Sequence, residues 1–307
     1  MVSQVHPDFE ALLPSWTLAI QADGYSANTL TAYRHALRKL AGWMAEHHPG
    51  VGPEDMTRDH IRGWLVDLRQ TRSKNTARTW FPGVRHFFRW AIDEQEITVD
   101  PTEGIRTPTA GETRTDVLKH DEIRALLAVC TGSTFIARRD SAIIMILADG
   151  GLRLAEIAGL QVSDADLLGR MLFVAGKGTN RSGPRRRAVP IGIKAARALD
   201  RYLRERRKHP YAELPWLWLG GRGHPRLRAA SLKERLTILG ERAGVPVHPH
   251  MFRHTWASEF RAAGGEEGDL MVLGGWRSRT MLDRYGKVVA ADRAQAAYRR
   301  RSLGDKL

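Results

Sequence analysis

Apolar residues recur at the three-to-four-residue spacing of a helix face through most of this 307-residue chain. Residues 8–48 hold two such stretches, the second starting after Ser26. Further helices are predicted at 57–70 and 75–94, and Pro82–Gly83 predicts an interruption in the last of them. The pattern therefore predicts a compact four-helix unit at the start of the chain.

Residues 100–115 have no helical periodicity and are rich in proline, glycine and threonine. Such a composition is typical of a linker. We predict a helical domain at 1–104, a linker at 105–115 and a second domain at 116–307.

The second domain is predicted to be mainly helical, with a small meander of short antiparallel strands inside it. Apolar periodicity and glycine positions place the strands at 167–168, 171–175 and 187–191. The predicted helices lie at 121–130, 139–149, 192–208, 229–243, 249–263, 266–273, 278–285 and 290–303, with one short helix just after Gly150–Gly151.

Composition narrows the class of protein. The net charge of +14 points to a polyanionic partner, most often nucleic acid; residues up to Ile105 carry −2 and the residues after it carry +16. The single cysteine, Cys130, excludes a disulfide framework and a cysteine-rich zinc site, and we expect a buried thiol there. No apolar run is long enough for a membrane span, and the N-terminus lacks the layout of a secretory signal, so we expect a cytoplasmic protein.

Basic residues gather in two places that are candidates for contacts with DNA. One is a block between Arg58 and Arg89, and the other is the glycine-rich segment between the second and third predicted strands. A solvated surface usually mixes charges of both signs, whereas these stretches segregate them. The DNA-binding candidates are Lys74, Arg78, Arg85, Arg181, Arg185, Arg186 and Arg187.

The stretch 250–285 carries the residues best suited to phosphate chemistry. His250 and Arg253 share one face near a predicted helix N-terminus, an end that favours anions, and Tyr285 follows a Gly-Gly-Trp turn. His250 and His254 also have the spacing of two zinc ligands. A metalloprotease helix would need glutamate at position 251, however, where this chain has Met251. Tyr285 by itself is also compatible with a packing residue.

Two upstream residues add cations to this set. Arg153 lies between two leucines at the end of a buried helix, and Glu156, three residues later, can orient it; a purely structural pair is the alternative. Lys177 lies on a glycine-flanked turn that does not match a phosphate-binding P-loop. An ordinary exposed lysine is the alternative there.

Taken together, these motifs resemble the tyrosine recombinase, or phage integrase, family of site-specific recombinases. The order agrees: Gly-Leu-Arg-x-x-Glu, a lysine in a β-hairpin, His-x-x-Arg-His, Gly-Trp, and a tyrosine nine residues later. The resemblance implies the catalytic set Arg153, Lys177, His250, Arg253, Trp276 and Tyr285, with Glu156 in support. Trp276 stands where most members have histidine, and Gly274 where they usually have leucine.

The resemblance also implies a fold and a reaction. The fold would be an N-terminal SAM-like core-binding domain and a C-terminal catalytic domain that form a C-shaped clamp on DNA. Tyr285 would form a 3′-phosphotyrosyl link, and strand exchange would pass through a four-way junction, without metal, ATP or another cofactor. The partners would be double-stranded recombination sites and three further copies in a homo-tetramer on DNA, the free protein being a monomer or weak oligomer.

Two other functions share parts of this pattern. A type IB topoisomerase uses the same tyrosine chemistry to relax supercoils, and a catalytically silent DNA-binding protein would keep only the basic surface. The helix expected at 290–303 is a candidate for docking on a neighbouring protomer, with packing on its own domain as the alternative. We expect the protein at the nucleoid.

Overall fold

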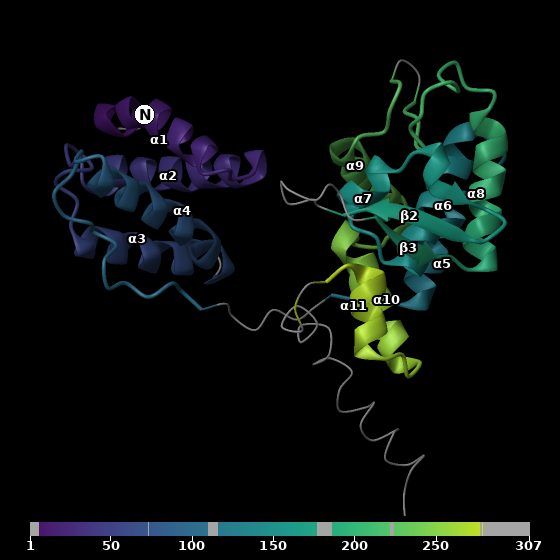
Figure 1. The fold of residues 1–307 in the computed structure, drawn as a ribbon. Helices are drawn as coiled ribbons and strands as arrows, with labels where there is room; N and C mark the ends of the chain where they lie inside the picture. The colour runs from purple at the N-terminus through teal and green to yellow at the C-terminus, as the bar shows by residue number, and fades with distance from the viewer. Residues whose placement is uncertain are drawn as a thin grey trace, which may run out of the picture. The chain divides into compact units, whose positions relative to one another are not determined.

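The computed structural model describes residues 6–72, 74–109, 116–176, 186–221, 224–276 and 278, and in helix α4 the side chain of Lys74 is outside this description. The chain forms two compact units, residues 1–113 and 114–307 (Figure 1). The predicted linker at 105–115 spans the division, and its exact bounds stay a prediction. Within the described residues no helix is long and apolar enough to cross a membrane.

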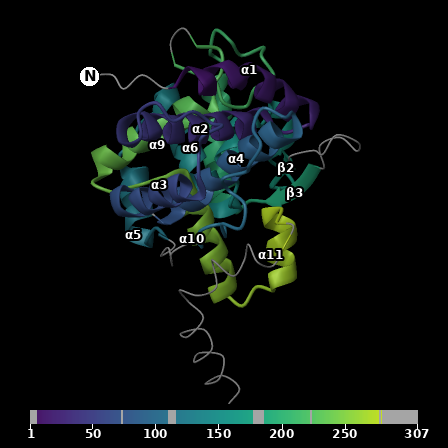
Figure 2. The same ribbon diagram turned by 90° about the vertical axis from the view of Figure 1, so that its left-hand side faces the viewer.

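Unit 1 consists of four helices, α1 (Pro7–Ala22), α2 (Ala27–His47), α3 (Arg58–Thr71) and α4 (Lys74–Asp93) (Figure 2). Ser26 caps α2 by accepting a hydrogen bond from the Thr29 amide at 3.2 Å. The core is strongly aromatic: Trp16, Trp64 and Phe87 are at most 1% exposed. The four-helix prediction is confirmed.

The predicted interruption of the fourth helix is wrong, because α4 continues through Pro82 and Gly83. Gly83 does not break the helix; it allows α4 to pack closely against α2. A Cβ atom there would lie 2.9 Å from the Tyr33 Cα atom of α2, so only glycine allows the two helices to approach this closely.

Replacing Gly83 with alanine is therefore expected to destabilise unit 1 by about 1–3 kcal/mol through overpacking. Urea denaturation with tryptophan fluorescence measures the change. Gly42→Ala is the matched control, because Gly42 lies inside α2 and, apart from the backbone of its own helix, nothing lies within 4 Å of its Cβ position; alanine there should stabilise the helix slightly. Equal effects of the two substitutions would contradict this packing role.

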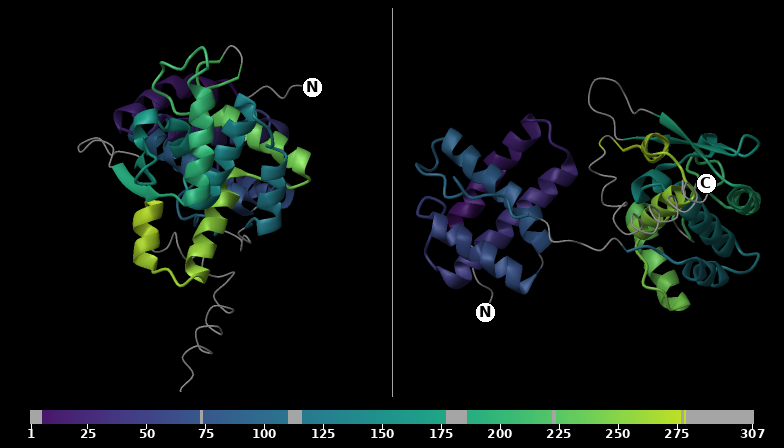
Figure 3. Two further views of the ribbon diagram at one scale, coloured as in Figure 1. Left: turned by 90° about the vertical axis from the view of Figure 1, so that its right-hand side faces the viewer. Right: turned by 90° about the horizontal axis from the view of Figure 1, so that it is seen from below.

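Unit 2 is built around the buried helix α6 (Phe135–Gly150), which packs against α8 (Ile193–Arg206) and α10 (Pro249–Ala262) (Figure 3). Helix α5 (His120–Ala128) packs against α9 (Ala229–Ala243), and α11 (Glu267–Gly274) follows α10. The short helix α7 (Leu154–Gly159) follows α6 directly, and the 3-10 turn η1 (Val162–Asp164) follows α7. Apart from Ser278, the predicted helices at 278–285 and 290–303 lie outside the described residues.

The sheet of unit 2 has three antiparallel strands in the order β1 (Ala165–Asp166), β2 (Met171–Ala175) and β3 (Arg186–Pro190). Leu172 pairs with Val189, and both are buried against the core. The first strand was predicted two residues too late. The Gly169 amide donates to the Asp166 carboxylate at 2.9 Å, which closes a turn, and Leu168 in that turn is 99% exposed.

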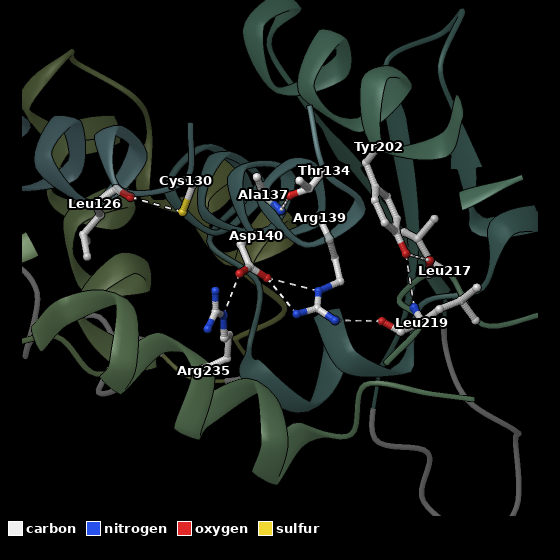
Figure 4. Close-up of polar contacts among 10 residues, drawn as sticks. All are labelled: Leu126, Cys130, Thr134, Ala137, Arg139, Asp140, Tyr202, Leu217, Leu219 and Arg235. Atoms are coloured by element: carbon white, nitrogen blue, oxygen red, sulfur yellow. Dashed lines mark hydrogen bonds and ion pairs between the residues drawn. The ribbon is translucent and has the colours of Figure 1, made fainter. Parts of the chain in front are cut away.

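A polar cluster crosses the core of unit 2 (Figure 4). Asp140, 1% exposed, accepts from Arg139 at 2.9 and 3.1 Å and from Arg235 of α9 at 2.6 Å. Burial raises the pKa of Tyr202 to about 12, and its hydroxyl donates to the Leu217 carbonyl. Every buried charge in this cluster has a partner, so it ties α6 to α9 without an isolated ion.

Cys130 lies at the edge of the same cluster. Its thiol donates to the Leu126 carbonyl at 3.3 Å, and burial raises its pKa to about 11. The expected buried thiol is confirmed, and a thiol of this pKa is a poor nucleophile.

Candidate active site

Arg253 lies in the first turns of α10, where Pro249 occupies the first helical position. Its side chain is 2% exposed and donates to the Gly151 carbonyl at 2.6 Å and to the Gly274 carbonyl at 2.5 Å. The guanidinium carbon lies 4.0 Å from the centre of the Trp276 ring, within cation–π distance. Arg253 therefore joins the end of α6 to the end of α11.

Arg153 sits at the N-cap of α7, and Glu156 caps the same helix from its third position. The Glu156 carboxylate accepts from the Arg153 amide at 2.8 Å and from its guanidinium at 2.7 Å. Arg153 also donates to the Gly275 carbonyl at 3.2 Å. The Arg153 side chain remains 37% exposed, so it is partly accessible to a ligand.

Arg187 of β3 completes this cluster. It donates to both Glu156 oxygens, at 3.0 and 2.8 Å, and to the Leu273 carbonyl at 2.8 Å. Burial alone would raise the pKa of Glu156, but the hydrogen bonds from Arg187 and Arg153 outweigh it, and the pKa is lowered. Glu156 is therefore a carboxylate shared by two arginines.

The turn after α11 contains two glycines that make room for tryptophan. A Cβ atom on Gly274 would lie 2.1 Å from the Trp276 ring, and Gly275 has a φ of 63°. Trp276, 6% exposed, stacks on Trp256 with 6.0 Å between ring centres. A side chain at position 274, such as the leucine expected from the family resemblance, would collide with the Trp276 ring, so glycine at 274 makes room for tryptophan at 276.

Gly151 packs against Trp256, one of the two stacked tryptophans. It ends α6 in the left-handed region with a φ of 57°, and a Cβ atom there would lie 2.1 Å from the Trp256 ring. Glycine at position 151 is therefore required by packing as well as by the helix end.

His250 lies one turn before Arg253, and its side chain is partly exposed and partly covered by its neighbours. Partial burial, and then the neighbouring His248, Arg253 and Arg153, lower its pKa below the usual value of a histidine. A neutral imidazole at neutral pH can accept a proton, which is the property required of a general base.

His254, one turn further along α10, has its pKa lowered to about 4, first by burial and then by His250, His248 and Arg253. An unfolded chain takes up the histidine proton near pH 6.5, whereas the folded chain resists it down to about pH 4. Stability should therefore fall as the pH drops from about 6.5 to about 4, by at most about 3 kcal/mol from this group. NMR titration of the His254 ring checks the account, and a midpoint near pH 6.5 would contradict it.

The DNA-binding candidates have unequal surroundings. Arg78 is exposed, whereas Arg85 donates to the Ile105 carbonyl and to Thr107, and Arg186 is ion-paired with Asp164. Arg187 is 13% exposed and faces Glu156 instead of solvent. The inward orientation of Arg187 could have been predicted from strand alternation, because Arg187 shares a strand face with the buried Val189. The catalytic candidates Lys177 and Tyr285, the DNA-binding candidates Arg181 and Arg185, and the Lys74 side chain all lie outside the described part of the chain.

In the described ranges no group of three or more histidine, cysteine or carboxylate side chains is placed to hold a metal. What the described site does present is a set of arginines around one glycine-rich turn, with a tryptophan wall and a neutral histidine. Such a set suits the non-bridging oxygens of a phosphodiester.

Comparisons of the whole chain with protein families and with known proteins give the same family. The Phage integrase family matches residues 116–291, and its N-terminal SAM-like domain matches residues 15–95. The tyrosine recombinase XerD of Bifidobacterium longum is 29% identical over 86% of this chain and 88% of its own length. The tyrosine recombinase XerC of Pseudomonas fluorescens strain Pf0-1 is 31% identical over 76% of each.

Solved structures agree on the fold. The XerH recombinase bound to a palindromic difH substrate matches with a TM-score of 0.71 and 18% identity, over 88% of this chain and 79% of that one. A λ integrase dimer bound to a COC′ core site matches with a TM-score of 0.68 and 18% identity, over 90% and 94%. The chain belongs to the phage integrase family, whose members break and rejoin DNA as site-specific recombinases.

Proposed function

We propose that this recombinase cuts and rejoins duplex DNA through Tyr285, with Arg153 and Arg253 holding the phosphate under attack. One observation carries the proposal: the two arginines, 100 residues apart in sequence, donate to the adjacent carbonyls of Gly275 and Gly274. Both guanidinium groups therefore converge on the turn from which the chain runs on to Tyr285.

The chemical step is a transfer of one phosphodiester bond. The Tyr285 oxygen forms a bond to phosphorus, and the bond from phosphorus to the 5′-oxygen breaks, which leaves a 3′-phosphotyrosyl link. Charge grows on the non-bridging oxygens in the transition state, where bidentate guanidinium groups stabilise it most. The 5′-hydroxyl of a partner strand reverses the step, so the bond energy is retained without ATP or a metal.

Two protons have to move in this step. His250, which is neutral at pH 7 because of its lowered pKa, is proposed to accept the Tyr285 proton or to donate a hydrogen bond to the phosphate. Lys177 is proposed to donate a proton to the departing 5′-oxygen. Trp276 has a single indole N–H, so it serves as a hydrogen-bond donor and a packing wall but not as an acid or base.

The same proposal extends to assembly on DNA. Four copies act on two recombination sites, exchange one pair of strands to form a four-way junction, and then exchange the second pair. The names of two structural relatives, a λ integrase dimer on a core site and a XerH complex with its difH substrate, support duplex DNA sites as the partner. The protein is proposed to work in the cytoplasm at the nucleoid, where such sites lie, and free copies are monomers or weak oligomers.

A strand-exchange assay tests the proposal. Duplexes that the protein binds are first enriched from a randomised library, and the enriched sequence is here called the selected site. Two selected sites with different flanking DNA are then incubated with the protein, and we expect products in which the flanks are exchanged. Relaxation of a supercoiled plasmid without exchange would instead make the chain a type IB topoisomerase-like enzyme. Binding without either reaction would leave a silent DNA-binding protein.

A further inference from the structure

The last two carbonyls of α11 and the carbonyl of Gly275, which follows the helix, are each bound by a different arginine. Leu273 accepts from Arg187, Gly274 from Arg253 and Gly275 from Arg153. Carbonyls at the C-terminal end of a helix have no partner within the helix and carry the negative end of its dipole, so they attract cations. We call Leu273–Trp276 the arginine-bound turn.

The three arginines differ in whether they are proposed to bind the phosphate. Under the proposed function, Arg153 and Arg253 must turn N–H groups toward the scissile phosphate, in competition with their carbonyl partners. Arg187 has no such role, because its Nε binds Leu273 and its two Nη atoms bind Glu156. Since all three of its guanidinium nitrogens are bound by Leu273 and Glu156, Arg187 is the arginine that can hold the turn while the other two bind substrate.

Glu156 links Arg187, which holds the turn, to Arg153, which is proposed to bind the phosphate. One of its oxygens lies 2.7 Å from Arg153 Nη1 and 3.0 Å from Arg187 Nη1, and its other oxygen binds Arg187 Nη2 and the Arg153 amide. Arg187 thus fixes the orientation of the carboxylate that orients Arg153. It also comes from β3, which follows the segment containing Lys177 in sequence.

We propose that Arg187 is a positioning residue for strand cleavage, which keeps the arginine-bound turn and Glu156 in place when Arg153 and Arg253 engage the phosphate. The inference rests on the proposed function and revises the expectation that Arg187 contacts DNA. A DNA-contacting arginine sets affinity, whereas a positioning arginine sets the rate of the chemical step.

Three variants of the full chain separate these roles: Arg187→Gln, Arg187→Lys and the control Arg138→Gln. Arg138 also pairs with a glutamate, Glu205 at 3.3 Å, but on α6 and α8 away from the site. With a nicked selected site at saturating concentration, Arg187→Gln is expected to lower the single-turnover cleavage rate at least tenfold while Kd for the DNA changes less than twofold. Arg187→Lys keeps the charge but not the bidentate geometry, so its cleavage rate should lie between those of Arg187→Gln and the unsubstituted chain. The control should match the unsubstituted chain.

A second measurement needs no DNA. In the free protein the amides of Gly275 and Trp276 donate to Val272 and Met271, and hydrogen exchange at these amides should accelerate at least tenfold in Arg187→Gln but not in Arg138→Gln. Unchanged exchange, an unchanged cleavage rate, or a fall in affinity as large as the fall in rate would each overturn the proposal. If the unsubstituted chain cleaves no selected site, the proposed function fails, and the exchange measurement still decides whether Arg187 holds the turn. Should Arg187→Gln not fold, Arg187→Lys carries both measurements.

Discussion

Replacing Arg253 with alanine is expected to lower the rate of strand cleavage by about 100- to 1000-fold, the usual cost of losing one donor to a developing oxyanion. The guanidinium lies in the first turns of α10, buried against Trp276, and its Nη atoms already bind the Gly151 and Gly274 carbonyls. Because the interaction strengthens in the transition state, the rate should fall much more than the affinity for DNA.

Single-turnover cleavage of the nicked selected site measures this effect, with Arg138→Ala as the control outside the site. Arg253→Lys supplies a second comparison, since lysine keeps the charge but cannot donate to two carbonyls or to two phosphate oxygens at fixed geometry. A cleavage rate in Arg253→Ala within a few-fold of the unsubstituted chain would remove Arg253 from the phosphate site.

Replacing Glu156 with glutamine is expected to destabilise unit 2 by about 2–4 kcal/mol, because it leaves Arg187 buried without its counter-charge. The Glu156 side chain is 8% exposed and its partner Arg187 13% exposed. Since the folded-state pKa of Glu156 is lowered, its contribution should be complete above the unfolded value near pH 4.5 and should disappear as the pH falls through the lower folded value.

Urea denaturation followed by hydrogen exchange of unit 2 peptides measures this free energy without interference from unit 1. Glu205→Gln is the matched control. It removes an ion pair with Arg138, whose partners are 20% and 26% exposed, and a second pair with the exposed Lys208; pairs with this much solvent contact should each contribute no more than about 1 kcal/mol. A loss of stability in Glu156→Gln as small as in the control would show that the shared carboxylate is not a structural centre of the site.

The helices could be predicted from the sequence because each buries one regular face. Helix α9 has the predicted bounds, and strand β2 likewise. Pro82–Gly83 was misinterpreted because a sequence does not reveal that α2 approaches Gly83 closely enough to need a glycine inside a helix. The first strand was displaced because Leu167 and Leu168 look apolar enough for a strand, although a side chain to main chain hydrogen bond from Asp166 turns the chain there.

The active site could be predicted only as a set of residue types. Motif spacing predicted Arg153, Glu156, Arg253 and Trp276 as site residues. It did not predict that the Gly275 carbonyl would accept from Arg153 and the Gly274 carbonyl from Arg253. Backbone carbonyls have no sequence signature, and Arg153 lies 122 residues before Gly275 in the chain. Arg187 was counted with a basic run because charge alone does not distinguish a strand residue that faces Glu156 from one that faces solvent.

The most direct test of the account is to trap and locate the covalent bond to DNA. The selected site, nicked next to the cleavage position so that the 5′-end is lost, should leave a protein–DNA adduct that survives denaturation. After digestion, mass spectrometry should find the nucleotide remnant on the peptide containing Tyr285, and Tyr285→Phe should give no adduct. An adduct of equal yield in Tyr285→Phe, or a remnant on another residue, would contradict the account.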